Sequence, residues 1–209
     1  MKACTIIMPI YNAHDATKAA IESVIQHTDL KTNKLLLIND KSTDERIGEL
    51  LSSYQDPNII VQHNQENLGF VKTVNIGMKF DKNDVLLLNS DTEVTANWLE
   101  KIKTCAYQDD NIATVTPLSN NATLASVPKA FVPSVLPEGY SLDKMAELVE
   151  NCSYKEYPEI PTGHGFCLFI KREVLNKVGY FDEESFGKGY GEESDFCYRC
   201  FNYGYRHVL

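Results

Sequence analysis

Two features are missing from this 209-residue sequence that would place it in a membrane or on a nucleic acid. It has no run of about 18 apolar residues, so we expect no transmembrane helix. Its 20 basic residues are outnumbered by 29 acidic ones, which gives a net charge of −9. A nucleic-acid partner needs a basic surface, so we expect none. The sequence therefore favours a cytoplasmic protein, with peripheral membrane association left open.

The cysteines lack the spacing of a metal site. Cys4 and Cys167 lie in apolar, strand-like runs, so we expect small buried thiols there. Cys197 and Cys200 form one CxxC pair without a second pair or two nearby histidines. This pattern argues against zinc binding or redox chemistry.

A phosphate-binding loop of the Gly-x-x-x-x-Gly-Lys-Ser/Thr type is also missing. An acidic chain that binds a charged nucleotide then needs a divalent metal, or nearby Lys and Arg side chains, to offset the repulsion.

What is present is an alternation of short apolar runs and amphipathic segments over residues 1–116. This alternation predicts a parallel sheet with helical crossovers. The expected strands are 4–9, 34–39, 59–61, 84–89 and 112–116, and the expected helices are 16–26, 44–53, 69–78 and 96–107.

The pattern changes after Pro117. Four prolines in residues 117–140 predict a long surface loop, which is often functional. The segments expected after it are a helix at 142–149, a strand at 166–171, a helix at 173–178, a glycine-rich run at 187–191, a helix at 194–203 and a strand that starts at 206.

Two aspartates directly follow expected strands: Asp40 and Asp91. In open α/β sheets, ligands bind at the carboxyl ends of the strands. Asp91, with Glu93 two residues on, can bind Mg²⁺ or Mn²⁺, which takes one or two protein carboxylates plus phosphate oxygens. The alternatives are local: Asp40 can form an Asx-turn, and Asp91 can cap the turn before Trp98.

A helix expected after Asn67 and Gly69 supports a nucleotide site beside Asp40. The glycine allows close backbone approach, and Lys72 can reach a nucleotide or stay solvated. Ser90, beside Asp91, belongs to the same expected site.

The acidic cluster Glu192, Glu193 and Asp195 follows the glycine-rich run. Crowded carboxylates raise each other's pKa, which makes a usable general base. The alternative is that they only stabilise the first turn of a helix. His164, next to Gly163, can contact an acceptor, or it can be an ordinary packed histidine.

Together these segments resemble the family-2 inverting glycosyltransferases of the GT-A fold. The resemblance covers almost the whole chain. It runs through Thr-Ile-Ile-Met-Pro-Ile-Tyr-Asn at 5–12, Leu-Ile-Asn-Asp at 37–40, residues 67–77, Leu-Asn-Ser-Asp-Thr at 88–92 and Gly-Glu-Glu-Ser-Asp-Phe-Cys-Tyr-Arg at 191–199.

The resemblance implies an α/β fold with a mostly parallel central sheet flanked by helices. Residues 1–116 would be a Rossmann-like half that binds the nucleotide sugar, and 117–209 an acceptor-binding half of the same compact domain, which we expect to be truncated at its C-terminus.

The resemblance also implies roles for single residues. Pro9, Tyr11 and Asn12 would line the nucleotide, and Asp40 would contact its base. The donor would be a UDP- or dTDP-sugar and the acceptor a glycan or a lipid-linked acceptor.

On the catalytic side, the resemblance implies that Asp91 would bind Mn²⁺ or Mg²⁺ and that Glu193 would be the catalytic base. Two positions depart from the family pattern: Asn89 replaces the first carboxylate of the DxD motif, and Glu193 replaces the commoner Asp, so that Glu192 is an alternative base.

Two other functions stay open at this point. A sugar-phosphate nucleotidyltransferase would need a basic, glycine-rich loop after the first strand, and residues 10–15 contain no Gly, Lys or Arg. A non-catalytic nucleotide- or glycan-binding module of the same fold would fit Asn89.

Overall fold

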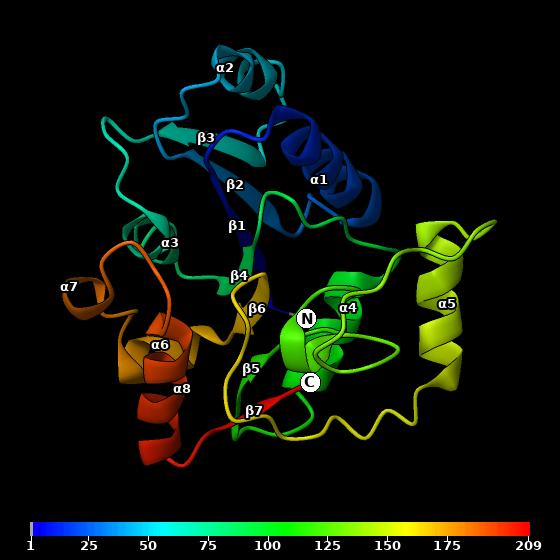
Figure 1. Ribbon diagram of the computed structural model, residues 1–209. Coiled ribbons are helices and arrows are strands. Elements are labelled where there is room, and N and C mark those ends of the chain that lie inside the picture. The colour runs from blue at the N-terminus through cyan, green and yellow to red at the C-terminus, as the bar shows by residue number, and fades with distance from the viewer. Residues whose placement is uncertain (1) are drawn as a thin grey trace.

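The computed structural model describes residues 2–209 and contains a seven-stranded sheet with helices on both faces (Figure 1). The strands are β1 (Cys4–Ile10), β2 (Lys34–Asn39), β3 (Ile59–His63), β4 (Asp84–Leu88), β5 (Ile112–Val115), β6 (Cys167–Ile170) and β7 (Arg206–Val208). The α-helices are α1 (His14–His27), α2 (Glu45–Ser52), α3 (Phe70–Met78), α4 (Trp98–Ala106), α5 (Leu142–Cys152), α6 (Arg172–Val178), α7 (Glu183–Phe186) and α8 (Glu192–Asn202).

The strand order is β3-β2-β1-β4-β6-β5-β7. Strands β1, β2, β3 and β4 run parallel to one another, as the strand–helix alternation predicts. Strand β6 runs antiparallel to both β4 and β5, and β5 and β7 are parallel. Because β6 is reversed, its first residue lies at the edge where the other strands end.

Side chains that alternate along the strands form two cores, one on each face of the sheet. Ile6 and Met8 pack with residues of α1, α2 and α4, and Ile7 packs with α3, α6 and α8. Strands buried on both faces need apolar residues at nearly every position, which explains their uninterrupted runs. Figure 1 shows these two helix groups on opposite sides of the sheet.

Several helices begin where the backbone turns through a left-handed conformation. Helix α3 begins at Phe70 after Gly69 (φ 81°), and α4 begins at Trp98 after Asn97 (φ 58°). Helix α8 begins at Glu192, two residues before the predicted start, because Gly191 (φ 105°) ends the preceding loop. Helix α2 has the predicted cap: the Asp44 side chain accepts a hydrogen bond from the Arg46 N–H.

The predicted loop at 117–140 contains a 3₁₀-helix at Thr123–Ala125, which the sequence pattern did not indicate. Helix α5 follows it and has no buried residue. The short helix α7 was also missed.

Two predictions from the sequence concern membrane-spanning helices and the state of the cysteines. Among residues 2–209, no helix has both the length and the apolar character that a membrane span requires. All six cysteines are free thiols, and Cys4 and Cys167 are buried as expected.

Candidate active site at the carboxyl edge of the sheet

Four loops meet at the carboxyl edge of the central strands. Three follow β1, β2 and β4, which end side by side because they are parallel. The fourth, residues 163–166, precedes the reversed strand β6, which pairs with β4 so that Cys167 lies opposite Leu88. This topology brings most of the predicted site residues to one edge.

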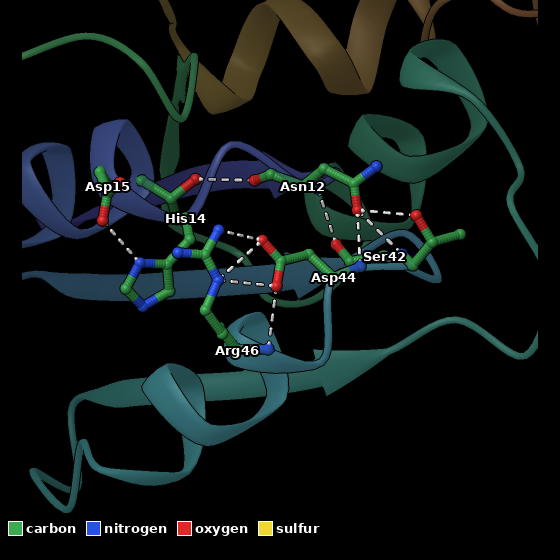
Figure 2. Close-up of polar contacts among 8 residues, drawn as sticks. Asn12, His14, Asp15, Ser42, Asp44 and Arg46 are labelled. Carbon is green, nitrogen blue, oxygen red and sulfur yellow. Dashed lines mark hydrogen bonds and ion pairs between the residues drawn. The ribbon is translucent and has the colours of Figure 1, made fainter.

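Asn12 joins the loops after β1 and β2 (Figure 2). Its Oδ1 atom accepts hydrogen bonds from the N–H groups of Thr43 (2.8 Å) and Asp44 (3.0 Å), and its own N–H donates to Ser42 Oγ at 2.9 Å. Asn12 has a φ of 62°, a conformation that asparagine tolerates better than most residues. Its side chain is thus used to shape the turn at 42–44.

Exposed charges surround this turn. Figure 2 shows the Arg46 guanidinium against the Asp44 carboxylate, with Nη2 to Oδ2 at 2.7 Å. The hydrogen bond from Arg46 lowers the pKa of Asp44, and one from His14 lowers that of Asp15. Both pairs are exposed, so each contributes little to stability.

Asp40 is 4% exposed, and its carboxylate organises the loop that leads to α3. Oδ1 accepts from Asn64 Nδ2 and from the Leu68 N–H, both at 2.8 Å, and Oδ2 accepts from the Gly69 N–H at 2.9 Å. A carboxylate has about four acceptor positions, so three are used within the protein.

The other predicted nucleotide residues lie around Asp40. Asn67 Nδ2 donates to the Asp40 carbonyl oxygen at 3.1 Å. Tyr11 and Lys72 are exposed, whereas Pro9 lies within β1, opposite Ile38 of β2.

Asp91 lies in an exposed turn directly after β4, and Ser90 precedes it in the same turn. The capping role considered for Asp91 is not what the structure shows: α4 has Asn97 as its N-cap residue. Within residues 2–209, no group of three or more His, Cys, Asp or Glu side chains could hold a metal ion. A single exposed carboxylate suits Mg²⁺ or Mn²⁺ only where phosphate oxygens supply further ligands.

A short path of backbone contacts joins the β4 turn to Glu193. The Asn89 N–H donates to the Phe166 carbonyl at 2.8 Å. One residue before Phe166, the Gly165 N–H donates to Glu193 Oε1 at 3.1 Å. A methyl group at residue 165 would overlap Glu193 Oε1, so this carboxylate could keep its position only with glycine at 165.

Two buried side-chain atoms close to Glu193 have no hydrogen-bond partner within the described chain: Glu192 Oε2 and His164 Nε2. Burial, and to a smaller extent the charge of Glu193, raises the pKa of Glu192 to about 7. Burial lowers the pKa of His164, against the opposing effect of Glu193. Buried atoms without partners are rare in folded proteins and often mark a functional site.

Asp195 and Gly163 have clear partners of their own. Asp195 Oδ2 accepts from Arg199 Nε at 2.8 Å, and Arg199 also donates to the carbonyls of Val178 and Tyr180. The Gly163 N–H donates to Cys197 Sγ at 3.2 Å. Arg199, paired with Asp195, therefore joins α8 to the end of α6, and Gly163 joins its loop to α8.

Sequence reasoning missed three residues that build this site. Gly165 positions Glu193, and its signal was the second glycine of Gly-His-Gly. Asn64 holds Asp40, and Thr116 Oγ1 accepts from the His164 N–H at 3.1 Å. No local sequence pattern around Asn64 or Thr116 predicts its hydrogen-bond partner.

The sequence is similar to a family of known proteins. The family model described as "Glycosyl transferase family 2" matches residues 5–179. An uncharacterized glycosyltransferase of Haemophilus influenzae is 32% identical over 110 residues, which cover 52% of this chain and 34% of that protein. The hyaluronan synthase of Pasteurella multocida is 28% identical over 193 residues, which cover 81% of this chain and 20% of that protein. The chain thus spans between a fifth and about a third of the length of these relatives.

The fold is also similar to that of solved protein structures. The structure of GalNAc-T7 with UDP, GalNAc and Mn²⁺ superposes with a TM-score of 0.76 at 18% identity, over all of this chain and 42% of that one. The sheet and its helices therefore form a GT-A fold, as predicted. Because the family model covers most of the sequence, the chain belongs to glycosyl transferase family 2.

Proposed function

We propose that this chain transfers a sugar from a nucleoside-diphosphate sugar to a hydroxyl group of a glycan or a lipid-linked glycan, with inversion at the anomeric carbon. The observation that carries the proposal is the contact between Glu193 Oε1 and the Gly165 N–H. It holds a carboxylate beside the turn after β4, where Asp91 stands, across the edge from Asp40.

Residues 1–116 would bind the donor. Asp40, which accepts three hydrogen bonds within the protein, would accept a fourth from a nucleotide base or ribose. Asn12, Tyr11 and Lys72 stand around the same edge. UDP in the GalNAc-T7 structure supports a uridine donor here, with a dTDP-sugar as the close chemical alternative.

Asp91 would hold Mn²⁺ or Mg²⁺ together with the two phosphates of the donor. Bound there, the ion offsets the negative charge that develops on the departing nucleotide. The Mn²⁺ of the GalNAc-T7 structure supports this assignment.

Glu193 would be the general base. The acceptor hydroxyl gives its proton to Glu193 while its oxygen forms a bond to the anomeric carbon. The bond from that carbon to the diphosphate breaks on the opposite face, and the nucleoside diphosphate leaves. Gly165 fixes one oxygen of the carboxylate, which leaves the other oxygen for the proton.

The test is the release of nucleoside diphosphate from UDP-, dTDP- and GDP-sugars in the presence of Mn²⁺. We expect turnover by the parent chain and a loss of about 100-fold or more in Glu193→Gln, the range for removing a general base. Glu184→Gln, which changes an exposed glutamate of α7, serves as the matched control. Nucleotide binding without turnover in the parent would instead favour the non-catalytic module, for which Asn89 in the DxD motif is the supporting observation.

A further inference from the structure

Tyr190 stands out in the loop before α8. Its side chain is 98% exposed, although Glu192 two residues later is 3% exposed. Its backbone φ is 74°. A single exposed aromatic residue is ordinary on a protein surface, but a bulky residue at positive φ is not. Such an outlier is a reason to look for a function.

The loop is held in this conformation from both sides. The Phe70 N–H, at the start of α3, donates to the Lys188 carbonyl at 3.3 Å, and the Gly189 N–H donates to the Phe186 carbonyl at 3.0 Å. A Cβ atom on Gly191 would lie 2.8 Å from the Phe186 ring, so the chain passes closely over that ring. These contacts hold the loop backbone on either side of Tyr190, whose side chain is exposed.

The loop that carries Tyr190 also lies close to residues of the candidate active site. Tyr190 lies two residues before Glu192 and three before the proposed base Glu193. The anchoring residue Phe70 lies close to Gly165, the glycine that holds Glu193. The loop that carries this exposed ring thus contacts the start of α3, and α3 in turn lies beside the glycine that holds Glu193.

We propose that Tyr190 binds the acceptor by stacking its ring on the apolar C–H face of a pyranose, so that a hydroxyl of that sugar reaches Glu193. This inference rests on the proposed function, because it names the acceptor surface of the same site. A tyrosine ring suits such a ligand, since it has an apolar face and a polar edge.

The surroundings favour a sugar over a lipid chain. The neighbours of Tyr190 along the chain are two glycines, the exposed Lys188 and the half-buried Glu193, whereas Glu192 is buried. A lipid chain needs a continuous apolar surface. A sugar ring instead presents hydroxyl groups that these charged side chains can bind.

The experiment is a titration followed by saturation-transfer NMR. The ligands are the methyl β-glycosides of glucose, galactose, N-acetylglucosamine and N-acetylgalactosamine, together with octyl β-glucoside. The proteins are the parent, Tyr190→Phe, Tyr190→Ala, Tyr190→Gly and the control Tyr198→Ala, which removes another exposed tyrosine, 68% exposed on α8.

We expect the parent and Tyr190→Phe to bind at least one methyl glycoside with affinities within about threefold, and Tyr198→Ala to match them. Tyr190→Ala and Tyr190→Gly should bind at least tenfold more weakly. The glycine variant separates loss of the ring from relief of the positive φ, and the melting temperature shows that each variant is folded.

Three outcomes would overturn the inference: no methyl glycoside binds the parent, Tyr190→Ala binds as the parent does, or saturation reaches only the alkyl protons of octyl β-glucoside. Nucleotide release from donor sugars by the parent, measured separately, reports on the proposed function. Failure there with intact glycoside binding would point to a glycan-binding module.

Discussion

Glu193 Oε1 accepts a hydrogen bond from the backbone N–H of Gly165 at 3.1 Å, across 28 residues of sequence. The contact joins the first turn of α8 to the loop before β6. Because β6 pairs with β4, the position of this carboxylate is set relative to the turn that carries Asp91.

A methyl group at residue 165 should move the Glu193 carboxylate. We expect Gly165→Ala to lower the rate of nucleotide release at least tenfold, because the new Cβ would overlap Oε1. The affinity for the donor should change little. The measurement is kcat and KM for the donor sugar, with the melting temperature recorded alongside.

Gly48 gives the matched control for this change. It lies in α2, and a Cβ there meets nothing within 4 Å. Gly48→Ala should leave turnover intact and stabilise the protein by about 0.5–1 kcal/mol, the usual gain from replacing glycine within a helix. Equal turnover in Gly165→Ala and Gly48→Ala would contradict the role of Gly165.

Glu192 should make stability depend on pH. Burial raises its pKa to about 7 in the folded state, whereas an unfolded glutamate titrates near ~4.3. Between these values the folded protein binds a proton that the unfolded chain has released, so this group lowers the free energy of unfolding as pH rises. Above pH 7 its contribution is constant.

Glu192→Gln removes that titration and keeps the shape of the neutral acid. We expect the variant to gain stability over the parent between pH 5 and pH 8, as measured by urea unfolding at both pH values. The exposed-site variant Glu184→Gln should show no such gain. A difference between Glu192→Gln and the parent that is the same at both pH values would contradict the assignment.

Asp40→Asn should destabilise the protein. The amide would place an N–H₂ group against donors that now point at a carboxylate, including the Gly69 N–H at 2.9 Å. Leaving a buried donor without an acceptor costs about 1–3 kcal/mol. Urea unfolding measures the loss, and a stability equal to that of the parent would show that the loop does not depend on this carboxylate.

Asp91→Asn, in contrast, should weaken metal binding without changing stability. Asp91 is exposed, so stability should be unchanged, but half-maximal turnover should need at least tenfold more Mn²⁺. Asp110→Asn is the control, since Asp110 is an exposed aspartate before β5, at the other edge of the sheet. An unchanged Mn²⁺ requirement in Asp91→Asn would remove Asp91 from the metal site.

The sequence was most informative where its pattern is local. Apolar runs located β1, β2 and β4, because strands buried on both faces need apolar residues throughout. The carboxyl-edge rule then placed Asp40 and Asp91 correctly at one edge. The reversal of β6 had no such signal, since a four-residue apolar strand reads the same in either direction.

The partners of side chains were hardest to predict. Asp195 was grouped with Glu192 and Glu193 because it is near them in sequence, yet one turn of helix directs it to Arg199. Gly165 was passed over because its partner lies 28 residues away. Contacts of this kind follow from tertiary packing, which no local period encodes.

The position of β6 between β4 and β5 has a consequence for how the protein is made. A ribosome releases residues 84–115 more than fifty residues before residues 167–170. The edges of β4 and β5 that pair with β6 therefore have no partner until β6 has been synthesised. A fragment that stops at residue 116 would keep those edges unpaired, and it should aggregate when expressed by itself.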